Sequence, residues 1–390
     1  METNDAATFA GYRRSDGRVG IRNHVLVLSP TGLTSAAAGR IADMVSGSVC
    51  VASGYGRGQV AADAQLHFDT LAGLATHPNV AATLVVSASD EITRSYVDAV
   101  AATGRPAVGL SLPGCHEDAL ALVDAGVRAT ARMVRTASAL RREACAIGDL
   151  CVAVECGHSD ASSGLVCNPL VGSAMERLVG AGGQAMFSET VEWTGAEHLL
   201  AKRAVDHDVA NRILRAVVER ETMISAAGGG IRAQNPGPQN RAGGLSTIEE
   251  KALGAISKGG NQAICGLLRP AQRPQGPGLF VMDTPYFSPE SMTAMVASGA
   301  QLVVFTTGAG NSYCSLLAPT IKISANPSTC QRLTEQVDFD ATALFLGTAQ
   351  PEDLTQAIVL KLLDIASGTL TFGEIVGEGG EVVSRLGASI

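Results

Sequence analysis

The sequence predicts an α/β protein built on two mostly parallel sheets. Short β-branched apolar runs alternate with Ala-rich helical stretches along most of the chain, and each strand–helix unit takes about 30 residues. We therefore expect an N-terminal, doubly wound, Rossmann-like domain over residues 1–146 and a second α/β domain over residues 147–390. With 46% hydrophobic and 17% charged residues, the chain has enough apolar side chain for two such cores.

The first domain is expected to hold four strands, each followed by a helix. Each strand is a short run of apolar, largely β-branched residues. The strands are predicted at 24–30, 48–54, 79–89 and 105–112, and the helices at 35–45, 60–75, 90–103 and 116–145. We place the boundary between the two domains near Ala146, because a charged helical stretch that begins at Arg135 ends at Gly148.

The second domain continues the alternation, with longer helices and one long loop. Its strands are predicted at 150–157, 184–189, 278–284, 301–307 and 320–325, and its helices at 169–181, 195–225, 246–257 and 289–298. The Asn/Pro/Gly-rich segment 235–244 is expected to be a loop.

Composition excludes several classes of function. Lys and Arg total 29 against 37 Asp and Glu, a formal charge of -8, and the basic residues are scattered, so nucleic acid is not expected as a partner. No stretch is apolar enough to span a membrane and none resembles a secretory signal, which predicts a cytoplasmic protein. The nine cysteines form no CxxC pair and indicate reduced thiols. Homo-oligomerisation is the default expectation for a large cytoplasmic protein.

Four polar clusters each follow a predicted strand of the second domain. They are VECGHSDASSG (154–164), FSETVEWTGAEH (187–198), FVMDTPYFSPE (280–290) and VVFTTGAGNSYC (303–314). Because the carboxyl ends of parallel strands meet at one edge of a sheet, the clusters predict a single polar cavity there. The alternative for any one cluster is a helix start capped by Ser, Thr or Asp.

Acid–base and metal-binding groups are concentrated in the first two clusters. Glu192 and His198 are candidate acid/base groups, since carboxylates and imidazoles transfer protons near neutral pH. Cys156, His158 and Asp160 alternate, so in an extended segment their side chains would share a face. With Glu189 they are the candidate ligands of a divalent ion such as Fe²⁺. The alternatives are a solvated His198 and a buried structural Cys156.

Other polar residues are candidates for holding a substrate. Arg241, in the loop with Asn235, would bind a carboxylate bidentately, unless the loop is a plain surface turn. Lys322 lies in an apolar frame and is expected to be buried, as the partner of a carboxylate or as a reactive base. Further candidate contacts are Asn168, Thr284, Thr306, Thr307 and Ser312.

A Gly-rich turn, SGYGRGQ (53–59), follows the second predicted strand. It lacks the third glycine of the dinucleotide-binding fingerprint and does not follow the first strand, so a nucleotide-dependent oxidoreductase is only weakly supported. Its amides, with Arg57, would suit an anionic group.

Long motifs resemble the altronate/galactarate dehydratase family, which also includes sulfolactate sulfo-lyase large subunits. They include GYRRSDGRVGIRN (11–23), ECGHSDASSG (155–164), SETVEWTGAEHLL (188–200), NPGPQNRAGGLSTIEEKALGAISKGG (235–260), MDTP (282–285) and PTIKISAN (319–326). The resemblance runs nearly end to end. It implies a lyase that removes the proton next to a carboxylate and expels the group on C3 of a small hydroxy acid, usually with a divalent metal. It also implies a separate small subunit.

The sequence departs from the family in the first domain. Family members typically carry cysteines in the loops after the first three strands, and by position Leu33, Arg57 and Asp90 stand there instead. Three thiolates at adjacent strand ends would suit iron or an iron–sulfur cluster, and none of these three side chains replaces a thiolate. We therefore expect that this N-terminal site is lost, that any metal lies in the second domain, and that Arg57 binds an additional acidic group.

Three functions follow as hypotheses. The first is a hydro-lyase that converts a hydroxylated sugar acid to a 2-oxo-3-deoxy acid. The second is a carbon–sulfur lyase that releases sulfite from a sulfonated 2-hydroxy acid. The third is a non-catalytic ligand-binding or assembly subunit, which the missing cysteines favour and the intact polar clusters oppose.

Overall fold

Two parallel sheets stack one above the other in the computed structural model, which describes residues 7–387 and 389. The smaller sheet has four strands in the order β4-β3-β5-β6, and the larger has seven in the order β10-β11-β9-β8-β12-β13-β14. All neighbouring strands within both sheets run parallel. The predicted α/β class is confirmed.

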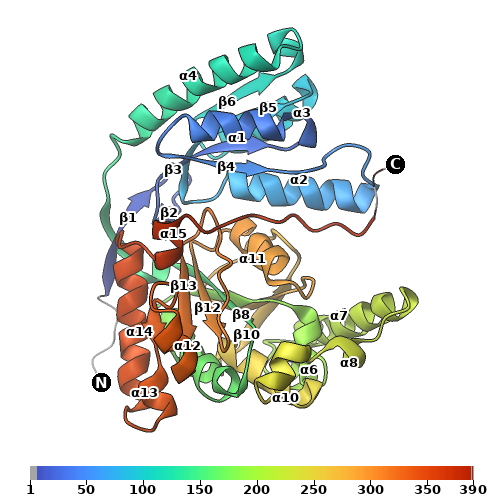
Figure 1. The fold of residues 1–390 in the computed structure, drawn as a ribbon, viewed down its shortest axis with the longest axis vertical. Helices are drawn as coiled ribbons and strands as arrows, with labels where there is room; N and C mark the ends of the chain where they lie inside the picture. The colour runs from blue at the N-terminus through green and yellow to red at the C-terminus, as the bar shows by residue number, and fades with distance from the viewer. Residues whose placement is uncertain (1–6, 388, 390) are drawn as a thin grey trace.

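The smaller sheet is covered by helices on both faces (Figure 1). Val25 and Val27 pack with α1 and α4, whereas Leu26 and Leu28 pack with α2 and α3, so the central strand is apolar throughout. The strands are β3 (His24–Ser29), β4 (Ser48–Ala52), β5 (Val80–Ser87) and β6 (Ala107–Ser111). The helices are α1 (Ser35–Asp43), α2 (Ala61–Ala75), α3 (Asp90–Ala101) and α4 (Ala119–Ala137).

One predicted helix of this region is too long. The expected helix over 116–145 ends at Ala137, and Glu143–Ala146 form β7 instead. β7 pairs antiparallel with β1 (Thr8–Arg13), which pairs antiparallel with β2 (Val19–Gly20). The antiparallel partner lies more than a hundred residues away, so the local pattern gave no sign of the pairing.

The larger sheet is also covered on both faces. Val152 and Val154 of the central strand pack in one core with α5 and α14, whereas Cys151 and Ala153 pack in a second core with α11. The strands are β8 (Cys151–Gly157), β9 (Gln184–Phe187), β10 (Ile264–Leu268), β11 (Gly278–Met282), β12 (Leu302–Thr307), β13 (Thr320–Ser324) and β14 (Phe339–Asp340). Helices of eight or more residues are α5 (Asn168–Gly180), α7 (His207–Ala226), α10 (Ile248–Ile256), α11 (Ser288–Ala297) and α14 (Pro351–Ala366). Shorter ones are α6 (Glu197–Lys202), α8 (Ile231–Gln234), α9 (Pro238–Ala242), α12 (Pro327–Arg332), α13 (Thr342–Phe345) and α15 (Phe372–Val376).

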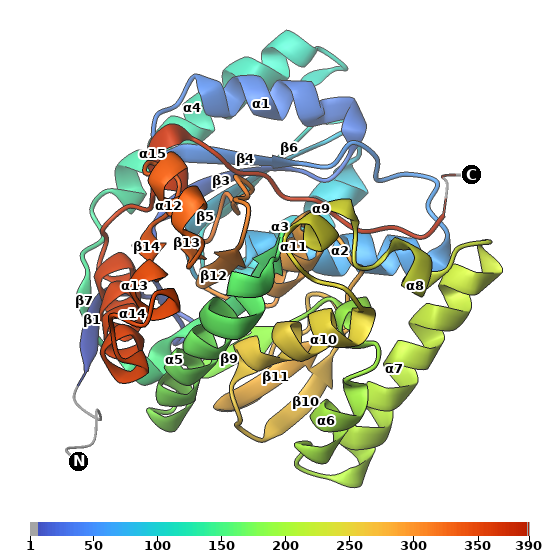
Figure 2. The ribbon, with the colours of Figure 1, turned by 60° about the horizontal axis from the view of Figure 1, so that its bottom comes forward.

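The expected helix over 195–225 is two helices, α6 and α7. They are separated because Asp206 caps α7, its carboxylate accepting a hydrogen bond from the Val209 amide at 2.8 Å. Figure 2 shows α7 running along the outer edge of the larger sheet.

The two layers meet where α2 lies against α11, and both helices contribute to one core. Gly73 allows this approach, because a Cβ there would lie 2.3 Å from the carbonyl oxygen of Ala297. Within the described chain, no helix is long and apolar enough to cross a membrane.

A C-terminal strap, residues 378–387, follows α15 along the junction of the layers to the far end of α2 (Figure 1). The buried Asp63 carboxylate of α2 accepts hydrogen bonds from the Leu386 and Gly387 amides, each at 2.8 Å. The strap therefore ties the end of the chain to the N-terminal layer.

Asp63→Ala is expected to release the strap locally. It removes two hydrogen bonds to a charged acceptor, each typically contributing about 1.5–3 kcal/mol, so amide exchange in the strap should accelerate by about tenfold or more. Hydrogen-exchange mass spectrometry measures this, with Asp69→Ala on the same helix as the control. Unchanged exchange at residues 381–387 would contradict the assignment.

Candidate active site

A cavity of about 390 Å³ lies at the carboxyl ends of β8 and β9. Its walls come from the segments after these two strands, from α9 and α10, and from the loops after β11 and β12. All four predicted polar clusters contribute to its lining, as expected for strand ends that meet at one edge.

Two lysines of the α10 region, Lys251 and Lys258, and the carboxyl groups of Glu155, Glu189 and Glu192 form the polar core of the site. The Lys251 ammonium lies 3.0 Å from Glu192, and the Lys258 ammonium lies 3.5 Å from Glu192 and 3.9 Å from Glu155. All four of these side chains are at least 95% buried. Lys258 also donates a hydrogen bond to the sulfur of Cys156 at 3.2 Å. Buried charges at this density are stable only because they are paired.

Lys251 and Glu155 are oriented by further polar partners. Lys251 donates to the Asn235 amide oxygen at 2.8 Å and to the Tyr286 hydroxyl at 3.0 Å. Glu155 accepts from the Ser291 hydroxyl at 2.5 Å and from the Cys156 amide at 3.0 Å. The cluster is therefore preorganised on strands and helices.

The carboxyl groups of Glu189 and Glu192 have opposite protonation preferences. Burial raises the pKa of Glu189 well above its usual value, and the neighbouring Glu155 and Glu192 carboxylates raise it further. Burial alone would also raise the pKa of Glu192, but Lys251 and Lys258 outweigh it and hold that pKa at about 2. Burial, with Glu192 nearby, raises the pKa of the Cys156 thiol to about 12. Near neutral pH the Glu189 carboxyl group is therefore protonated, whereas that of Glu192, three residues later, is ionised.

Glu189 has an unusual backbone conformation. Its φ of 67° lies in the left-handed region, which a non-glycine residue occupies only when its surroundings hold it there. The Glu189 amide donates to the Thr284 hydroxyl at 2.9 Å, and the buried Oε2 atom has no hydrogen-bond partner among the described residues.

Glu155, Cys156 and Glu189 place ligand atoms within 4.8 Å of one another, close enough to share one ion. Carboxylate oxygen and thiolate sulfur together suit a borderline ion such as Fe²⁺. The donor set therefore fits a divalent metal.

Sequence comparison identifies the family. The profile described as D-galactarate/Altronate dehydratase, C-terminal, matches residues 147–389, and that described as D-galactarate dehydratase/Altronate hydrolase, second domain, matches residues 11–138. The chain belongs to the D-galactarate/altronate dehydratase family. The lyase class of this family agrees with the resemblance found in the sequence.

The relatives of this chain are named for different reactions: one is a sulfo-lyase subunit and the others are dehydratases. The (2R)-sulfolactate sulfo-lyase subunit beta of Chromohalobacter salexigens is 38% identical over 97% of both chains. The galactarate dehydratase (L-threo-forming) of Escherichia coli is 39% identical over 58% of this chain and 43% of its own length. The altronate dehydratase of Escherichia coli is 28% identical over 93% of this chain and 74% of its own.

Within this family member, the structure brings together only part of the predicted metal set. Cys156 and Glu189 meet, but their third partner is Glu155, which was not predicted. Asp160 instead accepts hydrogen bonds from Ser162 at 2.6 Å and from Asn326 at 2.8 Å. His158 lines the cavity but is exposed, and its Nδ1 lies 2.8 Å from the Gly310 carbonyl oxygen. The expectation of a Cys–His–Asp face is wrong, because the chain turns at His158, where φ is 50°.

His198 does not reach the cavity, which corrects its predicted place beside Glu192. It is exposed in the first turn of α6, where the neighbouring Glu197 carboxylate accepts a hydrogen bond from the Gly195 amide at 2.6 Å. Glu192 lies in the cavity as predicted.

Most predicted substrate contacts support the backbone around the site instead. Thr306 donates to Asn168 at 2.5 Å, and Thr307 accepts from the Gly310 amide at 3.1 Å. Asn235 holds Lys251 and Thr284 holds Glu189, so both serve the site indirectly. The exposed predicted contacts outside the cavity lining are Arg57, Arg241 and Ser312.

Leu33, Arg57 and Asp90 follow β3, β4 and β5, three adjacent strands. Leu33 and Arg57 are exposed, and Asp90 accepts a hydrogen bond from Ser111. Loss of a metal site here stays a prediction.

Lys322 is buried as predicted, but its environment differs from the expected one. Its ammonium donates to the Tyr313 carbonyl oxygen and lies 3.7 Å from the centre of the Phe305 ring, with no carboxylate within ion-pair distance among the described residues. Tyr313 lines the cavity, so Lys322 supports the cavity wall from behind.

Burial lowers the pKa of Lys322 to about 8, which predicts a pH-dependent stability. An unfolded lysine has a pKa near 10.4, so between about pH 8 and 10.4 the unfolded chain binds more protons and stability rises with pH. Lys322→Met should abolish this rise, measured by guanidinium unfolding at pH 7, 9 and 10. Lys202→Met, at an exposed position, is the control, and a rise that persists in Lys322→Met would refute the assignment.

Proposed function

We propose that the protein is a lyase that eliminates the C3 substituent of a small 2-hydroxy acid to give a 2-oxo acid, with water as the leaving group. The observation that supports this most is the pair Glu189 and Glu192, whose pKa values are displaced in opposite directions within one cavity. Such a pair supplies a proton donor and a proton acceptor at the same pH.

Lys251 is the group suited to the substrate carboxylate. It lines the cavity, and its ammonium is already fixed by Asn235 and Tyr286. A substrate carboxylate beside Lys251 would weaken the hold of this lysine on Glu192 and so raise the basicity of Glu192. Glu192 then accepts the C2 proton, and the ammonium groups stabilise the negative charge that develops on the carboxylate.

Glu189 is the group suited to the leaving hydroxyl. As the C2 proton passes to Glu192, the C3–O bond breaks and the proton of Glu189 passes to the departing oxygen, giving water and an enol that tautomerises to the 2-oxo acid. We further propose that Glu155, Cys156 and Glu189 are the residues that would hold a divalent ion. Such an ion would supply Lewis-acid assistance to the leaving group in place of the Glu189 proton.

The second candidate is elimination of sulfite from a sulfonated 2-hydroxy acid. The relative named as a sulfolactate sulfo-lyase subunit, which matches 97% of this chain, favours it. The protonated Glu189 favours water, because hydroxide leaves only when protonated, whereas sulfite leaves as a stable anion.

A separate small subunit is also proposed, because that relative is named as a subunit beta and covers nearly all of this chain. The assay therefore includes candidate small-subunit proteins.

The test is a panel of aldonic, aldaric and sulfonated 2-hydroxy acids, assayed anaerobically with and without Fe²⁺. The 2-oxo acid and sulfite are measured separately. A 2-oxo acid without sulfite supports the dehydratase, and equimolar sulfite supports the sulfo-lyase. Tight binding of an acid without either product, with the small subunit present, would contradict the lyase proposal and favour a binding subunit.

A further inference from the structure

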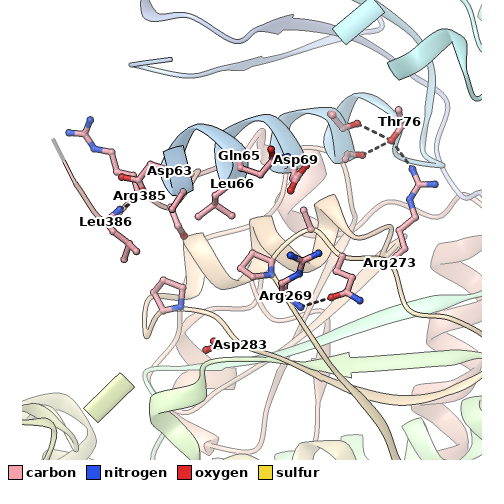
Figure 3. A pocket seen from close by; sticks show the side chains of 18 of the residues that line it. Asp63, Gln65, Leu66, Asp69, Thr76, Arg269, Arg273, Asp283, Arg385 and Leu386 are labelled. Atoms are coloured by element: carbon pink, nitrogen blue, oxygen red, sulfur yellow. Dashed lines mark hydrogen bonds between the residues drawn. The ribbon is translucent and has the colours of Figure 1, made fainter. Parts of the chain in front are cut away.

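A groove of about 1000 Å³ separates α2 of the N-terminal layer from α7 and the loops of the C-terminal layer. Asp283 and Arg220 both line it, and Figure 3 shows Asp283 on the C-terminal side, below Arg269. The neighbouring Pro285 lines the groove, whereas Tyr286 lines the active-site cavity. The segment after β11 is therefore the wall between the two spaces.

Asp283 lines the groove and also contacts Thr190, the residue that follows Glu189. One oxygen of the Asp283 carboxylate accepts a hydrogen bond from the Thr190 hydroxyl at 2.6 Å and another from the Arg220 Nε at 2.9 Å. The Arg220 side chain is 16% exposed and the Asp283 side chain 30% exposed, so the pair is partly shielded from water and fixed at both ends.

Glu189 depends on outside support for its conformation. Its left-handed backbone is held by the Thr284 hydroxyl, which accepts from the Glu189 amide, and by the Thr284 carbonyl, which accepts from the Thr190 amide at 3.4 Å. The Thr190–Asp283 hydrogen bond is the third attachment of the same dipeptide to the end of β11. Without this hydrogen bond, the strained backbone of Glu189 is expected to relax and to move the Glu189 carboxyl group.

We propose that Asp283, held by Arg220, is a positioning residue that acts through Thr190 to place the Glu189 carboxyl group. The proposal rests on the proposed function for its kinetic consequence, but its structural consequence stands alone.

Thr190→Val and Thr190→Ser form the central test, because valine removes the hydroxyl at equal size and serine keeps it. A displacement of about 1 Å in a catalytic group costs about 100-fold, so Thr190→Val and Asp283→Asn should lower kcat by about tenfold or more. KM should stay within about twofold, since neither residue contacts substrate. Thr190→Ser should restore most of what Thr190→Val loses. Thr222→Val, exposed on α7, is the matched control.

Crystal structures of wild type, Thr190→Val and Asp283→Asn give a readout that does not depend on activity. We expect Glu189 to leave the left-handed region, or its carboxyl group to move away from Cys156, in both variants. Unchanged placement of Glu189 in Thr190→Val, or unchanged kcat in an active enzyme, would overturn the proposal. A displaced Glu189 in a protein that converts no acid would support the positioning role while refuting the proposed lyase function.

Discussion

Lys258→Met is expected to lower the free energy of unfolding by about 3–5 kcal/mol at neutral pH, the usual consequence of removing one partner from a buried ion pair. The Lys258 side chain is fully buried, and it faces Glu155, Glu192 and the Cys156 sulfur. Its removal leaves Lys251 alone to balance two buried carboxylates. The lyase activity should be lost as well, because the site would rearrange to protonate or hydrate Glu192.

The deficit of Lys258→Met should shrink in acid, and the sign follows from Glu192. With a folded pKa of about 2, Glu192 contributes stability that is fully present above its unfolded pKa of about 4.3 and is lost as the pH falls towards 2. In the variant the folded pKa of Glu192 rises, so less stability remains to be lost in that window. Guanidinium unfolding at pH 7 and pH 3 measures both effects.

Lys202→Met is the matched control for this variant, because Lys202 is exposed at the end of α6. It should unfold like wild type at both pH values. Equal stability of Lys258→Met and wild type at pH 7 would show that Lys258 does not balance the buried carboxylates.

The strands could be predicted because their signal is local. A parallel strand buried on both faces needs a continuous apolar run, and β3, β5, β8 and β12 each have one. β10 (Ile264–Leu268) was missed because Gly266 interrupts a run of only five residues. β1 and β7 were missed because each is explained only by its distant partner.

The sequence predicted where the cavity lies, but not all of the residues that form it. Strand ends carry a recognisable polar signal, so Cys156, Glu189 and Glu192 were found from the sequence. Lys251 and Lys258 were missed, although they lie seven residues apart, two helical turns, so that both point to the same side of the α10 region. Lysine on a helix is usually solvated, and only the buried neighbours Ile248, Ala252 and Ala255 indicate that this face points inward.

His198 and Arg241 show the opposite error. Both side chains are chemically suited to the proposed reaction and close in sequence to residues that line the cavity, yet both are exposed outside that lining. Helices α6 and α9 that carry them are only six and five residues long. Over so short a helix the sequence gives no periodicity from which the inward face could be read.

Glu192→Gln is expected to lower kcat/KM by about 100-fold to 10,000-fold, because it removes the proposed acceptor of the C2 proton. The amide keeps the size of the side chain and an oxygen that can accept a hydrogen bond from Lys251, although it removes the negative charge of the pair, so the effect should fall mainly on kcat provided that unfolding shows the variant to be folded. His198→Ala, on an exposed side chain, should leave kcat/KM within about twofold of wild type. A loss of less than about tenfold in Glu192→Gln would remove Glu192 from the chemistry.

Glu189→Gln distinguishes the two proposed reactions, because its effect on the rate depends on the leaving group. If water leaves, the variant lacks the proton that the departing oxygen needs, and a loss of about 100-fold or more is expected. If sulfite leaves, no proton is required and the loss should be small. Single-turnover rates on a hydroxylated and a sulfonated acid, measured in parallel, therefore test the residue and the reaction together. An undiminished rate of water elimination in Glu189→Gln would show that the acid is another group, and the unusual backbone of Glu189 would then serve only to hold an ion beside Glu155 and Cys156.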